Sequence, residues 1–312
     1  MILHICQEGY EAFLAKELAP PAEKGPGWVR SASGGADLCF AHYSLLEPAA
    51  LEAPSAKGQA QALADFFLST SREERYEEAW PLTVEGEGKR ARVIEELVLE
   101  LLKKRMARVA RLARPGRPEA GRRRGLFALL AGGRVHASRE AVFGGQRRMA
   151  DDPQAPSRSY LKAEEAYAVL GRGPQPGESV VDLGAAPGGW SYSAAKRGAR
   201  VDAVDNGPLK GGALNHPLIA HRPEDAFKLR PRPADWLFCD MVEDPDRVLD
   251  LVGAWIGSGN CRRFVVNLKY GRLDPLPLLR RVRAALAPRC TVLKLRHLYH
   301  DREEITAVGE VS

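Results

Sequence analysis

The chain has 312 residues, of which 45% are hydrophobic and 28% charged, and its formal net charge is +6 at pH 7. These values are ordinary for a soluble globular protein, and the length is enough for two domains. No apolar run approaches the ~20 residues of a membrane-spanning helix, and the first residues become charged too soon for a signal peptide. The basic balance favours an anionic partner.

The cysteines are scattered, and they are Cys6, Cys39, Cys239, Cys261 and Cys290. An odd number without any Cys-x-x-Cys pair argues against a zinc site and against a disulfide framework. It favours a reducing compartment, so we expect a cytoplasmic protein that needs no metal and no membrane.

Strand and helix patterns alternate in the first half of the chain, which predicts a small α+β region. The predicted strands are residues 2–6, 28–30, 37–42, 80–84, 126–130 and 135–138, and the predicted helices are residues 11–18, 61–69 and 91–111. Gly34 and Gly35 form a predicted turn, and the stretch 47–60 predicts a loop or linker, with a helical start as the alternative.

The most basic stretch of the chain is 103–124, where Glu119 is the only acid. Its basic residues are Lys103, Lys104, Arg105, Arg108, Arg111, Arg114, Arg117, Arg122, Arg123 and Arg124. Arg105, Arg108 and Arg111 recur every three residues on a predicted helix face, before Pro115 and Gly116 end the helix. The stretch is interpreted as a surface that follows RNA or DNA phosphates, and the alternative is a solvated helix end with a basic loop.

A polar, proline-rich stretch at 150–157 predicts a domain boundary, with one domain at 1–149 and another at 150–312. A helix begins near Arg158, with Ser157 or Ser159 as its N-cap. Strands at 179–183, 201–205, 234–240, 263–267, 291–298 and 305–308 then alternate with helices at 190–197, 246–256 and 276–286. This regular alternation predicts an α/β fold with a doubly wound, Rossmann-like sheet.

A loop of small residues, Gly184 to Gly189, joins the first of these strands to a helix that opens at Trp190. Such an order places backbone N–H groups and a helix N-terminus beside the strand's carboxyl end. The loop lacks the G-x-G-x-x-G spacing of a dinucleotide site and the Gly-Lys-Ser/Thr end of a phosphate loop, and it holds no Lys or Arg. It therefore suits a ligand without a large negative charge, or else it is a tight turn that binds nothing.

Charged residues stand where four predicted strands end, namely Asp205, Asp225, Asp240 and Lys269. Asp205 lies about 20 residues after the loop, where nucleoside-binding sheets place a carboxylate for ribose hydroxyls. Asp225 can accept a hydrogen bond from an adenine amino group. Any one of them can equally be a helix cap or a solvated residue, but together they predict a site.

The chemistry that this set predicts is methyl transfer from S-adenosyl-L-methionine. The nucleoside of this cofactor needs a carboxylate at its ribose. Its sulfonium and amino acid parts suit a neutral loop lined by backbone better than a basic one. Asp182, on the first strand, is a candidate for orienting the loop.

The run 182–190, Asp-Leu-Gly-Ala-Ala-Pro-Gly-Gly-Trp, resembles the FtsJ/RrmJ-type ribose 2′-O-methyltransferases. The segments 155–166, 204–208, 239–243, 267–269 and 298–304 further resemble the ribosomal RNA large subunit methyltransferase M family. The resemblance implies methylation of the 2′-hydroxyl of a cytidine in 23S ribosomal RNA. It also implies a THUMP-like RNA-binding region at 1–149 beside a Rossmann-like methyltransferase domain at 150–312.

By this resemblance the catalytic residues are Lys162, Asp240, Lys269 and Glu304, with Glu303 as the alternative to the last. Because a ribose hydroxyl is a poor nucleophile, its proton must leave as the methyl group arrives. Lys269 would take that proton as a neutral amine with Lys162 as a second cation nearby, while the acids orient the two amines.

The matching cofactor positions are Ser159, Gly184, Ala186, Pro187, Gly188, Gly189, Trp190, Asp205, Asp225 and Asp240. Two alternatives stay open, a 2′-O-methyltransferase of another RNA and a non-catalytic RNA-binding protein that keeps the fold. The paired lysines and acids at strand ends argue against a pure binder.

Overall fold

The computed structural model describes residues 1–18, 20–32, 34, 37–86 and 88–312. Within these residues the chain forms two compact units. The N-terminal unit comprises Met1–Ala36 and Ala41–Gly144, and the C-terminal unit comprises Asp37–Phe40 and Gly145–Ser312. Along the sequence, the boundary between the units falls between Gly144 and Gly145, a few residues before the predicted division between 149 and 150.

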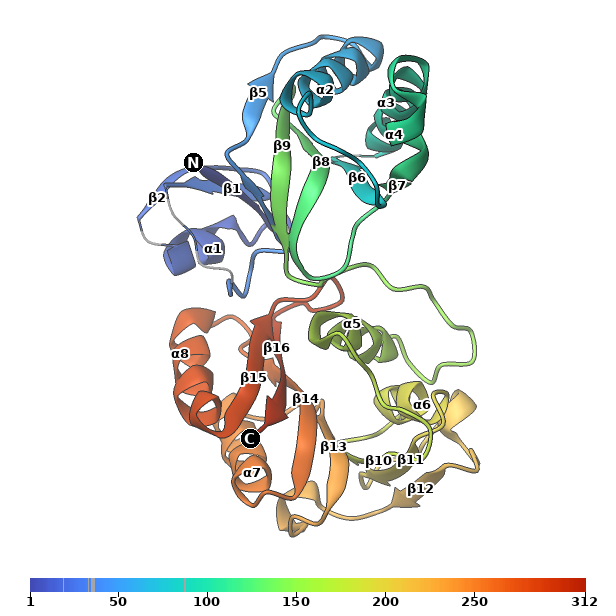
Figure 1. The fold of residues 1–312 in the computed structure, drawn as a ribbon. Coiled ribbons are helices and arrows are strands. Elements are labelled where there is room, and N and C mark those ends of the chain that lie inside the picture. The colour runs from blue at the N-terminus through green and yellow to red at the C-terminus, as the bar shows by residue number, and fades with distance from the viewer. Residues whose placement is uncertain (19, 33, 35–36, 87) are drawn as a thin grey trace. The chain divides into compact units, whose positions relative to one another are not determined.

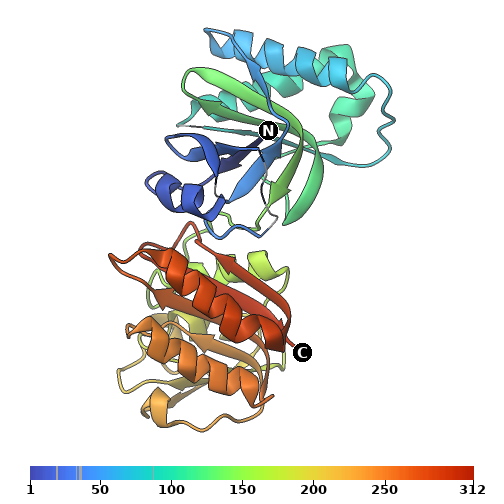
Figure 2. The same ribbon diagram turned by 90° about the vertical axis from the view of Figure 1, so that its left-hand side faces the viewer.

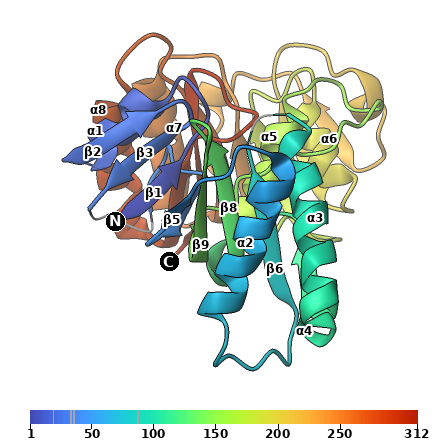
Figure 3. The ribbon, with the colours of Figure 1, turned by 90° about the horizontal axis from the view of Figure 1, so that it is seen from above.

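In the described part of the N-terminal unit the sheet has nine strands, in the order β2-β3-β1-β4-β9-β8-β6-β7, with β5 paired to β9. The strands are β1 (Ile2–Ile5), β2 (Pro21–Gly25), β3 (Trp28–Ser31), β4 (Tyr43–Leu46), β5 (Ala49–Leu51), β6 (Trp80–Glu85), β7 (Ala113–Pro115), β8 (Gly121–Ala131) and β9 (Arg134–Phe143). The helices are α1 (Glu11–Leu18), α2 (Ala56–Thr70), α3 (Arg90–Arg105) and α4 (Ala107–Leu112). Helices α2 and α3 pack on each other and over β6, β8 and β9 (Figures 1 and 3). The predicted mixture of strands and helices is confirmed, and the THUMP-like character of this unit stays a prediction.

The predicted loop at 47–60 is wrong, because β5 and the start of α2 occupy it. Ser55 caps α2 by accepting a hydrogen bond from the Gly58 N–H at 3.1 Å. Ala60, Leu63 and Phe67 follow at helical spacing and are fully buried. A cap and a buried apolar face therefore stabilise this helix. Its alanine-rich sequence made that apolar face hard to recognise from composition.

The predicted strand at 37–42 is also wrong. Residues 37–40 belong to the C-terminal unit, where the Cys39 carbonyl accepts from the His297 N–H at 2.8 Å and Asp37 pairs with Arg296 at 2.7 Å. The apolar residues here are buried without a strand ladder. Gly35 of the predicted turn lies outside the described residues.

The long helix predicted at 91–111 is broken in two at Met106, whose backbone has φ −151° and ψ 65°. Arg105 therefore ends α3, whereas Arg108 and Arg111 lie on α4. The three-residue spacing of these arginines does not run along one continuous helix face.

The C-terminal unit contains a seven-stranded sheet in the order β12-β11-β10-β13-β14-β16-β15, as far as its described residues show. The strands are β10 (Ser179–Leu183), β11 (Arg200–Val204), β12 (Ile219–Arg222), β13 (Ala234–Cys239), β14 (Cys261–Lys269), β15 (Cys290–Arg296) and β16 (Glu304–Val311). Strands β10 to β14 are parallel, and β16 runs antiparallel between β14 and β15. The strand order reverses beside β10, which confirms the predicted doubly wound sheet.

Helices cover both faces of this sheet, and they are α5 (Tyr160–Leu170), α6 (Gly189–Ala195), α7 (Pro245–Gly257) and α8 (Pro275–Leu286). Helices α5 and α6 pack on one face through Trp190, Tyr167 and their neighbours. Helices α7 and α8 lie side by side on the other face (Figure 2). Short 3-10 turns, Gly211–Ala213 and Ala226–Lys228, stand beside β12 in place of full helices. The carboxyl ends of β10, β11, β13 and β14 consequently share one edge of the sheet.

Candidate active site

The loop after β10 needs glycine at two positions. Gly184 has φ +75° and Gly188 has φ +106°, a region that residues with a Cβ rarely adopt. A Cβ on Gly184 would overlap Met241, and a Cβ on Gly188 would lie 2.5 Å from the Cβ of Ala213. The loop therefore lies in close contact with the segment after β13 and with the 3-10 turn at 211–213.

Asp205, directly after β11, holds this loop. Its Oδ2 accepts the Ala186 N–H at 3.0 Å, and its Oδ1 accepts the Gly207 N–H at 2.7 Å. Asp225 caps the 3-10 turn before β13 by accepting the Phe227 N–H at 3.0 Å. Both carboxylates thus have structural partners, Asp225 Oδ2 also lies 3.5 Å from the Lys228 ammonium, and both line the cavity described next.

A cavity of about 540 Å³ opens at the carboxyl ends of β10, β11 and β13. The cofactor positions in its lining are Gly184, Ala186, Asp205, Asp225 and Asp240. Residues that sequence reasoning missed complete the wall, among them Asn206, Glu224, Phe227, Met241, Val242 and Glu243. The described lining contains five carboxylates, Asp205, Glu224, Asp225, Asp240 and Glu243, and neither lysine nor arginine.

The described lining of this cavity does not include five of the predicted cofactor positions, which are Ser159, Pro187, Gly188, Gly189 and Trp190. A Cβ on Gly189 would lie 2.6 Å from the Ser159 hydroxyl, so Ser159 lies against the start of α6. The Trp190 indole is 2% exposed and donates to the Ser159 carbonyl at 2.9 Å, so its place is in the core. The Asp182 carboxylate accepts the Ser191 hydroxyl at 2.6 Å and orients α6 from beneath.

Four elements bring the four predicted catalytic side chains together. Lys162 lies on α5, Asp240 follows β13, Lys269 ends β14, and Glu304 begins β16 directly opposite Lys269 in the antiparallel register. The Lys162 ammonium forms an ion pair with Glu304 and lies 3.9 Å from Asp240 Oδ1. Lys269 Nζ lies 2.7 Å from the same Asp240 oxygen and 3.1 Å from the Met241 carbonyl oxygen. Neither lysine belongs to the described lining of the cavity, and Asp240, which does line it, connects both amines to it.

Glu304 occupies the place for which Glu303 was the alternative. The Glu304 side chain is 11% exposed and faces Lys162, whereas Glu303 is exposed. The backbone carbonyl of Glu303 accepts from the Tyr270 and Gly271 N–H groups at 3.0 and 3.1 Å. These bonds fix the segment after β14 against the start of β16.

A fifth charged residue, Asp301, lies behind the four and was not predicted. It is 3% exposed and accepts the Leu298 N–H, the Asn267 amide and the Thr306 hydroxyl at 2.9 to 3.0 Å. Burial raises the pKa of Asp301 to about 7. Burial alone would lower the pKa of Lys162, but the charges of Asp240, Asp301 and Glu304 outweigh it and raise that pKa. Lys162 is therefore a protonated cation at neutral pH.

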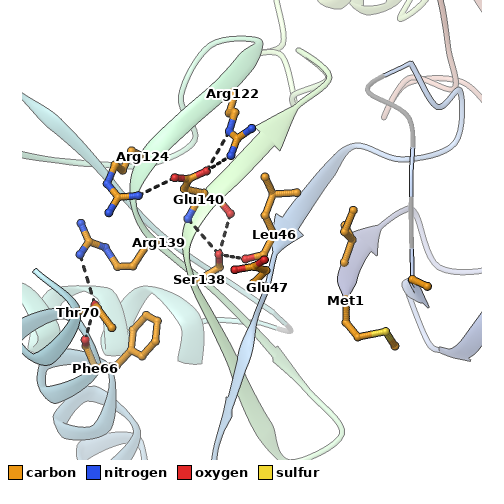
Figure 4. Close-up of a pocket in the computed structure, with 12 residues that line it drawn as sticks. Met1, Leu46, Glu47, Phe66, Thr70, Arg122, Arg124, Ser138, Arg139 and Glu140 are labelled. Atoms are coloured by element: carbon orange, nitrogen blue, oxygen red, sulfur yellow. Dashed lines mark hydrogen bonds and ion pairs between the residues drawn. The ribbon is translucent and has the colours of Figure 1, made fainter.

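Some basic side chains of the stretch 103–124 form ion pairs with carboxylates, and others do not. Its paired arginines are Arg105 with Asp65, Arg117 with Glu85, Arg122 with Glu140, and Arg124 with Glu74 and Glu140. Glu140 lies between Arg122 and Arg124 at the edge of a cavity of about 550 Å³ (Figure 4). Within the described residues no carboxylate pairs with the exposed Lys103, Lys104, Arg108, Arg111 or Arg114.

The described ranges contain no group of three or more His, Cys, Asp or Glu that could hold a metal ion. No helix among them is long and apolar enough to cross a membrane.

Comparison with known proteins defines the class of this site. Residues 155–254 match the family model of FtsJ-like methyltransferases. This match covers α5, β10 and the loop after it, β11, β13 and much of α7, so this part of the C-terminal unit is similar to FtsJ-like methyltransferases.

Two curated relatives carry the name Ribosomal RNA large subunit methyltransferase M. The protein of Laribacter hongkongensis (strain HLHK9) is 48% identical over 165 residues, which are 49% of this chain and 47% of that protein. The protein of Thauera aminoaromatica is 42% identical over 171 residues, which are 49% of this chain and 45% of that protein. Both resemblances found in the sequence are confirmed, and the matched part of the chain spans about half the length of these relatives. A solved structure of a putative hemolysin from Streptococcus thermophilus covers 53% of this chain and 70% of its own at 19% identity, with a TM-score of 0.43, too low to bear on the assignment.

Proposed function

We propose that the chain transfers a methyl group from S-adenosylmethionine to the ribose 2′-hydroxyl of a cytidine in 23S ribosomal RNA. The observation that carries this proposal is the meeting of Lys162, Asp240, Lys269 and Glu304, of which Asp240 lines the cavity. The FtsJ-like domain and the names of the relatives support methyl transfer to large subunit ribosomal RNA. The cytidine and the 2′-oxygen rest on the motif resemblance.

The cavity suits the proposed cofactor by charge. Its described lining has five carboxylates and neither lysine nor arginine, and three of them pair with cations outside the lining: Asp240 with Lys269, Asp225 with Lys228 and Glu243 with Arg247. Asp205 and Glu224 have no such counter-ion among the described residues, so the wall favours a sulfonium over the phosphates of a dinucleotide. Asp205 would hold the ribose hydroxyls and Asp225 the adenine amino group, with Phe227 as an apolar wall. The bound cofactor would supply an electrophilic methyl group on a positively charged sulfur.

The two lysines differ in what their partners let them do. Lys162 is held as a cation by Glu304, Asp240 and the buried Asp301, so it can stabilise negative charge that develops on the 2′-oxygen. Lys269 would act as the base. The structure pairs its amine with Asp240 at 2.7 Å and the Met241 carbonyl at 3.1 Å, so Lys269 would have to give up a proton before it could accept the one from the hydroxyl.

The proton balance follows from these roles. The cofactor, held by Asp205 and Asp225, would supply the methyl group and leave as a neutral thioether, and Lys269 Nζ would accept the proton that the 2′-hydroxyl loses. Positioned proton transfer contributes about 10²- to 10⁴-fold in rate, and the alignment of the reacting atoms contributes the rest.

RNA as the substrate is supported by the exposed cations of α3 and α4, which face no carboxylate among the described residues. Cations of this kind neutralise phosphates and release counterions, which gives affinity without sequence preference. They would hold the RNA, while the C-terminal unit performs the chemistry.

The test is transfer of a tritiated methyl group to ribosomal RNA from cells that lack this protein. Wild type should label the RNA, and Lys269→Met should lower the rate at least about 100-fold. Lys57→Met, which removes an exposed lysine on α2, is the matched control and should retain the wild-type rate. Equal labelling by wild type and Lys269→Met would contradict the assigned base.

A further inference from the structure

Asp301, in the loop between β15 and β16, is held from three parts of the fold at once. Its Oδ1 accepts the Asn267 amide of β14 at 3.0 Å, and its Oδ2 accepts the Thr306 hydroxyl of β16 at 3.0 Å. The Leu298 N–H, in the same loop, donates to Oδ2 at 2.9 Å. All three partners donate, so the surroundings suit a carboxylate that has lost its proton.

The strand partners of Asp301 lie one step behind the catalytic pair on the same two strands. Asn267 stands opposite Thr306 in the register of β14 and β16. Lys269 stands opposite Glu304. Because every second residue of a strand points to one face, each partner shares a face of the sheet with the catalytic residue two positions along its strand. Asp301 therefore reaches the sheet directly behind the catalytic pair.

Helix α5, which carries Lys162, covers this same face of the sheet. Val265 of β14 and Val308 of β16 lie on that face, and both pack in one core with Ala163 of α5. The Lys162 side chain therefore lies over the two strands that hold Asp301.

Glu165 ties the loop of Asp301 to the same helix. It lies on α5 and is 0% exposed. Its carboxylate accepts the Tyr299 and His300 N–H groups at 2.9 and 3.2 Å, and also the Arg147 N–H at 3.0 Å. The loop is thereby bound to α5 through Glu165 and to β14 and β16 through Asp301. The place of Asp301 relative to α5 is fixed from both sides.

Charged groups from two elements face Asp301. Lys162 and Glu165 face it from α5, and Glu304 faces it from β16. Burial raises the pKa of Asp301 to about 7, although the charge of Lys162 lowers it. Burial raises the pKa of Glu165 to about 8. Asp301 is therefore the first of these two buried acids to ionise, and above neutral pH it carries a negative charge.

The two catalytic lysines consequently face unequal numbers of carboxylates. Lys162 pairs with Glu304 and lies 3.9 Å from Asp240 Oδ1. The charge of Asp301 acts on it as well, and although burial lowers the pKa of Lys162, the three carboxylates together raise it. Among the described residues Lys269 has one ion pair, with Asp240 at 2.7 Å. Since nearby carboxylates favour the protonated form of an amine, the proton is held more firmly on Lys162.

We propose that Asp301 is the positioning residue that decides which catalytic lysine becomes the neutral amine. Held behind Glu304, its charge keeps the proton on Lys162, and Lys269 is the lysine that releases a proton to solvent. Lys269 then has a lone pair for the proton of the 2′-hydroxyl, while Lys162 keeps its positive charge. This inference rests on the proposed function, which assigns the base to Lys269.

The experiment uses the full chain with carbon-13 in its lysine side chains, whose Cε signals in NMR spectra shift as each ammonium loses its proton. Spectra of Lys162→Met and Lys269→Met assign the two signals. In wild type, Lys162 should keep its proton to a pH at least about one unit higher than Lys269 does. The Lys162 signal should also move in a smaller step near pH 7, where Asp301 ionises.

Asp301→Asn keeps the shape of the side chain and removes its charge. The smaller step should vanish, and the proton-dissociation constant of Lys162 should rise about tenfold or more. The alkaline fall in the rate of methyl transfer to ribosomal RNA should move to lower pH by the same amount. Glu310→Gln, which removes a half-buried carboxylate near the far end of β16, is the matched control and should change none of these quantities.

Calorimetry with S-adenosylhomocysteine on the same samples shows whether each variant is folded. The wild-type titration decides the order of proton loss by itself, even if Asp301→Asn does not fold. If Lys162 loses its proton at the same pH as Lys269 or before it, the inference is overturned. It is also overturned if folded Asp301→Asn leaves the titration of Lys162 unchanged.

Labelling of ribosomal RNA by wild type separates this inference from the proposed function. If wild type labels the RNA but the lysines lose their protons in the opposite order, the inference fails and the proposed function stands. If the titrations are as expected and wild type does not label the RNA, the proposed function is contradicted and the order of proton loss stands.

Discussion

Replacing Lys162 by methionine tests whether the ion pair with Glu304 is one energetic unit. The two side chains are each 11% exposed, so neither is well solvated. With the ammonium removed, the one donor left to Glu304 among the described residues is the Arg302 N–H at 3.4 Å. Leaving one partner of a buried pair uncompensated costs about 3 kcal/mol, and replacing both partners by apolar groups is often neutral. We therefore expect Lys162→Met to be clearly destabilised, and Lys162→Met with Glu304→Leu to recover most of the loss.

Activity should behave differently from stability in this pair of variants. Because the proposed role of Lys162 is to supply the cation at the 2′-oxygen, both variants should lose methyl transfer, including the one whose stability recovers. Thermal midpoints from scanning fluorimetry and tritium transfer measure the two quantities on the same protein. Lys196→Met is the matched control, because its pair with Asp152 is 57% exposed on the lysine side and should cost less than about 1 kcal/mol.

Two results would refute this reasoning. If the single and the double variant melt at the same reduced temperature, the destabilisation does not come from an uncompensated carboxylate. If the double variant transfers methyl groups at the wild-type rate, Lys162 has no part in the reaction.

Three further predictions follow from the same structure. Burial raises the pKa of Glu165 to about 8 and that of Asp301 to about 7, so the folded chain holds protons that the unfolded chain releases. These two groups should therefore lower the thermal midpoint as the pH rises from 5.5 to 8.5. The thermal midpoint of Glu165→Gln with Asp301→Asn should fall less over that range, and an equal or greater fall would contradict this. Arg108→Ala with Arg111→Ala should weaken RNA binding and reduce its logarithmic salt slope by about 1 to 2, without changing binding of S-adenosylhomocysteine, and an unchanged slope would remove α4 from the RNA surface. Asp205→Ala should weaken binding of S-adenosylhomocysteine about tenfold or more in calorimetry, and wild-type affinity would exclude Asp205 as a cofactor ligand.

Local patterns in the sequence predicted most of the C-terminal unit. There the predicted strand at 179–183 has the bounds that the structure shows, and in the N-terminal unit the predicted helix at 11–18 does too. Apolar periodicity and the glycines or prolines at their ends fix the bounds of both elements. Lys162, Asp240, Lys269 and Glu304 could be placed because they stand in short motifs at element ends. Asp240 and Lys269 meet because their parallel strands end at one edge of the sheet, and the antiparallel register of β16 brings Glu304 opposite Lys269.

The remaining features depend on partners that are distant in the sequence. Glu165 reads as an ordinary helical acid until the N–H groups of Arg147 and Tyr299 are brought to it by the fold. Asp301 likewise reads as an exposed residue of a charged run, although it is buried. A carboxylate three residues after Lys162, on the same helix face, was the one local signal for such an anchor. The helix break at Met106 could not be predicted, because no glycine or proline stands there.

The most direct test of the central claim is the position of the transferred methyl group. Ribosomal RNA methylated in vitro by wild type is digested to nucleosides, which are then separated and identified by mass spectrometry. The account predicts 2′-O-methylcytidine with wild type, and its loss with Lys269→Met while S-adenosylhomocysteine still binds. A methyl group on a base, or undiminished 2′-O-methylcytidine with Lys269→Met, would contradict it.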